Sequence, residues 1–174
     1  GQWTQRALPI SLDALVVFGI GAGYHIQQLI ERYDIKHLII YEPQHQYLKC
    51  SMSMLSWQNI LRLAQKKGTA LYFQLEQDGR NVEQDLAELK QNTQTNECYF
   101  YKHYNHIVFD ALLTQIQQHG LFSVSGLSLY ALEKESVGDI SPRWSVPLDS
   151  DAWTATQLPQ ERFNKNLSAF KTFF

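Results

Sequence analysis

The stretch "ALVVFGIGAGYH", residues 14–25, indicates how this chain folds. Its first five residues are apolar and largely β-branched or aromatic, as in a strand that helices bury on both faces. Glycines in a GxGxG pattern end the strand, and a helical pattern follows; these glycines are Gly19, Gly21 and Gly23. Such a turn directs backbone N–H groups at the helix start towards an anionic or polar ligand. The loop therefore either holds a cofactor or only turns the chain.

Strand and helix patterns alternate along the chain after this loop. Helical periodicity over residues 24–33 leads into the apolar run "HLIIYEP", and the alternation continues through two more apolar runs, "TALYFQL" and "ECYFYKH". The helices expected between and after them cover about residues 44–55, 56–68, a segment with a capping-box spacing from Asn81 to Gln84, and 104–120. Strands that alternate with helices favour a parallel sheet. We predict a Rossmann-like α/β three-layer sandwich with a mainly parallel sheet, over residues 8–135.

The remaining residues, 136–174, show prolines, scattered aromatics and no sustained period. This segment is predicted to be a linker or docking arm that leads into a further, downstream domain. Large aromatic groups of this number need a surface to cover; they are Trp144, Trp153, Phe163, Phe170, Phe173 and Phe174. The sequence leaves three alternatives for the surface that they cover: the chain's own domain, a downstream domain, or a second copy in a homo-oligomer.

Composition excludes several classes of protein. The formal net charge of −2 provides no basic field for nucleic acid or anionic lipid. No apolar run is long enough for a membrane span, and the first residues lack the pattern of a signal peptide. The two cysteines, Cys50 and Cys98, are far apart and without a CxxC partner, as expected in the cytoplasm.

The spacing of the glycines bears on the kind of cofactor. Tyr24 stands where the dinucleotide fingerprint GxGxxG has its last glycine, which disfavours NAD. A GxGxG loop followed by an acid at the end of the second strand resembles class I methyltransferases, which bind S-adenosylmethionine. That resemblance implies that Glu42 holds the ribose and Asp78 contacts the adenine. Those enzymes usually carry an acid two places before the first glycine, where this chain has Val17, and their catalytic motifs are missing after the fourth strand.

A closer resemblance rests on "VVFGIGAGYHIQQLIERY", residues 16–33, and "LIIYEPQHQYLKCSM", residues 38–52. Together they resemble the N-terminal domain of the motility accessory factor glycosyltransferases, bacterial proteins implicated in attaching nonulosonic sugars to flagellin. The resemblance places sugar transfer in a central domain with its own glycine-rich phrase, and no such phrase follows Gly120. It implies an accessory module whose partners are flagellin or a downstream glycosyltransferase domain. Its motif positions here are Gly19, Gly21, Gly23, Tyr24, His25, Glu42 and Pro43.

Histidines supply the remaining candidates. His103 follows the fourth strand, and ligands of open α/β sheets bind beyond the carboxyl ends of the strands, so we expect His103 and Tyr104 to face the glycine loop. His25 opens the first helix, where its imidazole can contact a ligand or cap neighbouring groups. His103 and His106 form an HxxH pair near Cys98, but no acid or second cysteine completes four ligands, and we predict no metal site.

Two hypotheses of different class follow. In the first, the chain is a non-catalytic or ligand-sensing N-terminal domain of a flagellin-modifying glycosyltransferase. In the second, it is a methyltransferase-like enzyme or a nucleotide-binding domain, with S-adenosylmethionine or a nucleotide in the glycine loop. Whether this chain catalyses a reaction by itself stays open at the level of sequence.

Overall fold

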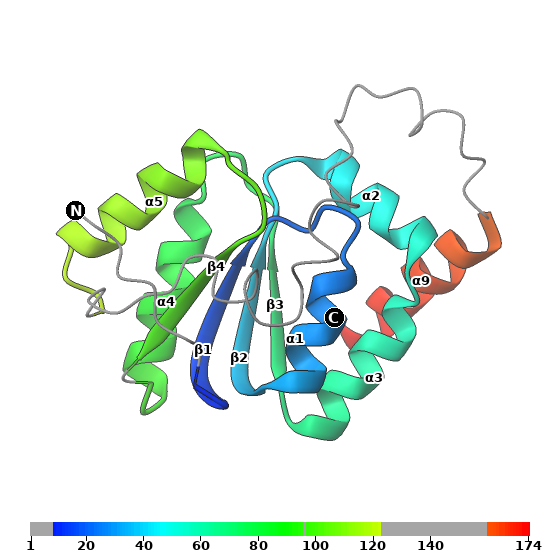
Figure 1. The fold of residues 1–174 in the computed structure, drawn as a ribbon, viewed down its shortest axis with the longest axis horizontal. Helices are drawn as coiled ribbons and strands as arrows, with labels where there is room; N and C mark the ends of the chain where they lie inside the picture. Colours follow the sequence, from blue (N-terminus) through cyan, green and yellow to red (C-terminus); the bar gives the residue numbers. More distant parts are fainter. Residues whose placement is uncertain (1–8, 96, 123–159) are drawn as a thin grey trace.

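A computed structural model describes residues 9–95, 97–122 and 160–174 of this chain (Figure 1). The order of its elements confirms the predicted alternation of strands and helices. They are β1 Ser11–Phe18, α1 Tyr24–Arg32, β2 Asp34–Tyr41, α2 His45–Met54, α3 Trp57–Lys67, β3 Ala70–Gln74, α4 Arg80–Asn92, β4 Cys98–Lys102, α5 Ile107–Gln118 and α9 Gln160–Phe173. The boundary predicted at residue 135 lies outside the described residues.

The described strands form one four-stranded sheet in the order β3-β2-β1-β4, with every neighbouring pair parallel. In the register of the sheet, Phe18 at the end of β1 lies between Tyr41 of β2 and Lys102 of β4. The strand order reverses direction between β1 and β4. Ligands of open α/β sheets bind in the crevice at such a reversal, so the fold itself directs attention to the loops that follow these two strands.

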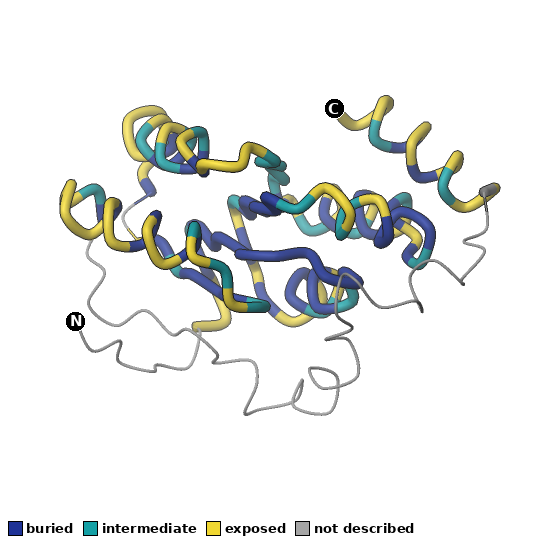
Figure 2. Tube along the Cα trace, turned by 90° about the horizontal axis from the view of Figure 1, so that it is seen from above, coloured by how far each residue is buried: buried dark blue, intermediate teal, exposed yellow. Residues whose placement is uncertain are grey.

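Helices cover both faces of the sheet, which confirms the three-layer sandwich (Figures 1 and 2). Successive residues of a strand point to opposite faces, and β1 divides its side chains in this way between two apolar clusters. Leu15 and Val17 pack with residues of α1 and α3, whereas Ala14, Val16 and Phe18 pack with residues of α4 and α5. All five side chains are fully buried, so the near-continuous apolar run has the burial that a central parallel strand requires.

Local signals set both ends of α3, whereas the start of α4 differs from the prediction. Ser56 caps α3 by accepting a hydrogen bond from the amide of Asn59, and Gly68 ends the helix in a left-handed conformation, as expected at a helix C-terminus. The predicted capping box of α4, with Asn81 as N-cap, was wrong: the N-cap is Gly79, two residues earlier. The helix begins at Arg80, with Gly79 as N-cap at φ 69° and the Asp78 carboxylate accepting from the Arg80 amide at 3.2 Å.

The described part of the aromatic tail is α9, which packs on α2 and α3 (Figure 1). Its Phe170 ring lies 5.4 Å from Trp57 and 5.2 Å from Phe73, measured between ring centroids. The tail thus covers a face of its own domain over these residues. Two of the aromatics predicted to need a surface, Trp144 and Trp153, lie outside the described residues. Among the helices described, none has the length and apolar character needed to cross a membrane.

The ammonium group of Lys67, the last residue of α3, stabilises the end of α1. It donates to the carbonyls of Ile30, Tyr33 at 2.8 Å and Glu31 at 3.2 Å, and lies 3.5 Å from the Asp34 carboxylate. The last carbonyls of a helix have no partner within the helix and are the groups that a lysine can satisfy.

We expect Lys67→Ala to lower the free energy of unfolding by about 1 to 3 kcal/mol, because a charged donor to these carbonyls is lost. Urea unfolding monitored by circular dichroism measures the change. The matched control is Lys66→Ala at the preceding, exposed position, and an equal loss in both variants would contradict the role of Lys67.

Candidate functional site

The glycine loop lies between β1 and α1, at the carboxyl end of the sheet. Its glycines all have positive φ angles: 103° at Gly19, 53° at Gly21 and 89° at Gly23. Residues other than glycine rarely adopt such backbone angles. Two backbone hydrogen bonds continue the sheet around the loop, from the Gly19 amide to Tyr41 and from the His103 amide to Phe18, both at 2.8 Å. The loop is therefore held to both neighbours of β1.

Side chains of the protein itself lie against each glycine. A Cβ atom at Gly19 would be 2.4 Å from the Tyr104 ring, and one at Gly21 would be 2.9 Å from the His103 ring. A Cβ atom at Gly23 would be 2.3 Å from the side chain of Leu55. Contacts below 3.0 Å require something to move. In this structure, the space that glycine opens around the loop is filled by residues of the α2–α3 and β4–α5 connections.

Glu42, the acid predicted to hold a ribose, is fully buried. Its Oε1 accepts a hydrogen bond from the Ile20 amide at 2.8 Å. Its Oε2 accepts from the Gln44 amide at 3.1 Å and from the Tyr104 hydroxyl at 2.5 Å. Burial raises the pKa of the carboxyl above its ordinary value, and these hydrogen bonds act in the opposite direction. Both carboxylate oxygens are thus engaged by the chain itself.

Tyr104 joins the loops that meet at this edge of the sheet. Beyond its bond to Glu42, its hydroxyl accepts a hydrogen bond from the side-chain amide of Gln44 at 3.5 Å. The centroid of its ring lies 5.2 Å from that of Tyr47 and 5.1 Å from that of Phe109. Burial and the adjacent Glu42 carboxylate raise the pKa of the Tyr104 hydroxyl, so the hydroxyl remains a donor at neutral pH. It therefore occupies one of the acceptor positions of Oε2.

Two histidines form a stacked pair beneath the loop. The rings of His25 and His103 are 3.7 Å apart between centroids and inclined by only 7°. One ring nitrogen of His25, Nε2, lies 3.0 Å from the Gly19 carbonyl, which assigns a proton to that nitrogen because a carbonyl only accepts. Burial lowers the pKa of both rings, for His103 to about 4, and His103 lowers that of His25 further. Both imidazoles are therefore neutral at neutral pH.

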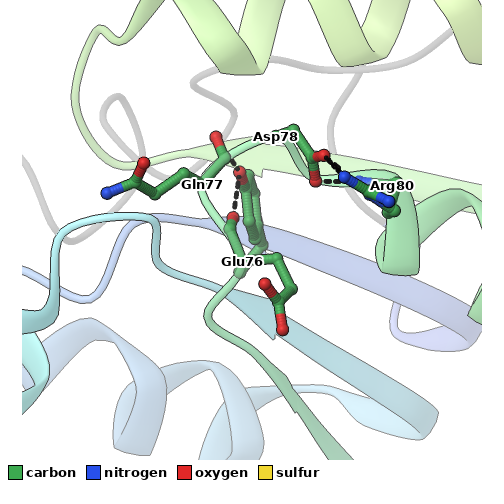
Figure 3. A network of polar contacts seen from close by, with 5 residues as sticks. Glu76, Gln77, Asp78 and Arg80 are labelled. Atoms are coloured by element: carbon green, nitrogen blue, oxygen red, sulfur yellow. Dashed lines mark hydrogen bonds and ion pairs between the residues drawn. The ribbon is translucent and has the colours of Figure 1, made fainter.

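The other predicted residues have separate surroundings. Tyr24 begins α1 and packs, half-buried, against the apolar cluster on the α1 side of the sheet. Asp78 lies in the β3–α4 turn and its carboxylate bonds the guanidinium of Arg80, with a closest distance of 2.5 Å (Figure 3). The same turn is held to the sheet because the Tyr41 hydroxyl donates to the Glu76 carbonyl at 2.8 Å. The structure brings together the three glycines, His25, Glu42 and His103, whereas Asp78 belongs to this neighbouring turn.

Sequence reasoning placed Tyr104 at this edge but missed its bond to Glu42, and it missed Leu55 altogether. The position of Tyr104 two residues after a strand was the available signal; nothing local indicates that its side chain reaches a carboxylate 62 positions away. The two histidines of the HxxH pair have different roles. His103 stacks on His25, whereas His106 is the N-cap of α5 and accepts from the Val108 amide at 3.2 Å.

Tyr104→Phe removes a hydrogen bond from a buried carboxylate, and we expect a loss of about 1 to 3 kcal/mol in unfolding free energy at about pH 8, where Glu42 is ionised. Because the folded-state pKa of Glu42 is raised, the carboxyl takes up a proton as the pH falls through that pKa. The loss should therefore shrink in acid, since a neutral carboxyl needs the phenol less. Urea unfolding at several pH values measures this. In the Glu42→Gln background the cost of Tyr104→Phe should not vary with pH, and a pH-independent cost in both backgrounds would contradict the argument.

The histidine pair predicts an acid sensitivity of the fold. Because the folded-state pKa of His103 is lowered from 6.5 to about 4, the unfolded chain binds more protons in this window. Stability is then fully present above the unfolded pKa and is lost as the pH falls, by about 1.4 kcal/mol per pH unit for each histidine. Glu42, with its raised pKa, acts in the opposite sense. His103→Phe keeps a ring against His25 and should flatten the acid dependence of unfolding; an unchanged slope would show that His103 does not titrate with folding.

Comparison with known proteins assigns the chain to a family. Searches among curated proteins and among solved structures found no match. A family model described as the glycosyltransferase Maf N-terminal domain matches residues 2–125, which include the whole described sheet, the glycine loop and Glu42. The match confirms the resemblance that the glycine loop and the Glu-Pro strand end indicated. This chain belongs to the glycosyltransferase Maf N-terminal domain family.

Proposed function

We propose that this chain is the N-terminal accessory domain of a bacterial motility-associated glycosyltransferase that modifies flagellin with nonulosonic sugars in the cytoplasm. Its role is to position or dock partners, which are flagellin or the catalytic domain of the same glycosyltransferase. Sugar transfer takes place in that catalytic domain. Membership of the Maf N-terminal domain family supports the association with a glycosyltransferase.

The observation that carries the accessory role is the state of the Glu42 carboxylate. A ribose hydroxyl held by this acid needs an accessible acceptor position, whereas the carboxylate is fully buried and already accepts three hydrogen bonds from the chain. Binding a ribose there would require Tyr104 to leave Glu42 and its contact with Gly19. The loop is thus built as a closed structural corner, which suits a domain that positions partners.

The alternative, a methyltransferase-like or nucleotide-binding domain, is favoured by one observation: three glycines with positive φ meet an acid at the carboxyl edge of the sheet. Two other observations disfavour it. Asp78, the residue expected at an adenine, is paired with Arg80, and Val17 is a fully buried core residue where an acid is usual. The alternative is therefore retained as an outcome of the test.

Calorimetric titration of the chain with three probes tests the proposal: S-adenosylhomocysteine, cytidine monophosphate and purified flagellin. We expect no micromolar binding of S-adenosylhomocysteine, because the carboxylate is buried behind its own hydrogen-bond partners and binding there carries a conformational cost. Flagellin binding supports the docking role, and binding of the cytidine nucleotide supports a ligand-sensing one.

Asp78→Ala is the matched variant, because Asp78 is half-exposed and its loss leaves the loop and Glu42 intact. Micromolar binding of S-adenosylhomocysteine that Asp78→Ala weakens would promote the methyltransferase-like alternative. Silence with flagellin as well as with both small molecules would remove flagellin as the partner of this chain and leave the catalytic domain.

A further inference from the structure

We propose that the corner between α2 and α3, residues 51–57, is a docking site for a helix, that α9 of the same chain occupies it, and that this docking holds the glycine loop in place. The proposal does not rest on the function proposed above. The family match ends at residue 125, so α9 lies outside it.

One side chain of α9, Asn166, satisfies both helix ends at this corner. Its Nδ2 donates to the carbonyls of Met52 at 2.5 Å and Leu55 at 2.7 Å, at the C-terminus of α2. Its Oδ1 accepts from the Trp57 amide at 2.9 Å, at the N-terminus of α3. Helix termini leave such groups without partners inside the helix. Asn166 is 2% exposed, so without α9 the corner needs other partners for three backbone groups.

Apolar contacts give the docking site its chemical specificity. The buried side of α9 presents Phe163, Asn166, Ala169 and Phe170, a stripe with helical spacing. Phe170 packs on Trp57 and Phe73, and Phe174 lies 5.4 Å from Phe73 between centroids. At the edge of the contact, the Arg162 guanidinium donates to the Met54 carbonyl at 3.0 Å. The site therefore fits an amphipathic helix with one buried asparagine among aromatic residues.

The corner also forms one wall of the glycine loop. The side chain of Leu55 occupies the space in which a Cβ of Gly23 would lie, and Ser51 is the next nearest neighbour there. Ser51 in turn accepts from the indole of Trp57 at 3.0 Å. Asn166 holds the backbone of Leu55 and Trp57 from the other side. A continuous set of contacts thus connects α9 to Gly23, and undocking of α9 releases Leu55 from its position over the loop.

Amide hydrogen exchange in the 174-residue chain, followed residue by residue by NMR, tests the proposal with Asn166→Ala. We expect exchange at the Trp57 amide to accelerate by about tenfold or more, through local opening of the corner. Exchange at the Ile20 and Gly23 amides of the loop should accelerate as well, while the Val16 amide in the centre of the sheet stays protected. Thr172→Ala, an exposed position on the same helix whose hydroxyl bonds only within it, is the matched control and should leave all four amides unchanged.

Arg162→Ala is the milder variant if Asn166→Ala fails to fold, because it removes only the bond to Met54. It should produce a smaller effect with the same pattern. Acceleration at Trp57 with an unchanged loop would overturn the coupling, no change at Trp57 would overturn the docking site, and equal acceleration at Val16 would show global destabilisation instead. A dimer in sedimentation velocity that Asn166→Ala dissociates would overturn the assignment of α9 to its own chain.

Discussion

The buried carboxylate of Glu42 is the constraint on which the carboxyl edge of this fold depends. A charge withdrawn from water is costly unless hydrogen bonds surround it, and here they come from three connections. The Ile20 amide belongs to the glycine loop, the Gln44 amide to the start of α2, and the Tyr104 hydroxyl to the β4–α5 connection. One acid at the end of β2 therefore ties together the loops that follow β1, β2 and β4.

In this arrangement the glycines have a role different from the one they have in an open cofactor-binding loop. In an open cradle, glycine lets a phosphate or ribose approach the backbone. Here the same absence of side chains admits Tyr104 to Gly19, His103 to Gly21 and Leu55 to Gly23. The reversal of strand order between β1 and β4 still creates a crevice position, but residues from within the domain fill it. Such a closed edge suits the partner-positioning role proposed above.

Polar side chains also connect elements that are distant in the sequence. Asn166 joins α9 to two helix ends, the Lys67 ammonium joins α3 to the end of α1, and the histidine pair joins α1 to the end of β4. The contacts of Asn166 and Lys67 are hydrogen bonds, in which loss of one partner leaves the other unpaired. These contacts specify which helix lies on which face, since apolar packing alone tolerates several arrangements.

The sequence by itself determined the layer architecture, because apolar runs with period-two and period-3.6 patterns depend only on residues near one another. It also placed the glycine loop, Glu42 and His103 at one edge, because carboxyl ends of parallel strands meet there. The tertiary structure alone decided what those residues touch. The bond from Tyr104 to Glu42 and those from Asn166 to the α2–α3 corner span 62 and 109 to 114 positions, and no local pattern encodes such contacts. Only the tertiary structure shows that side chains of the same domain close the loop.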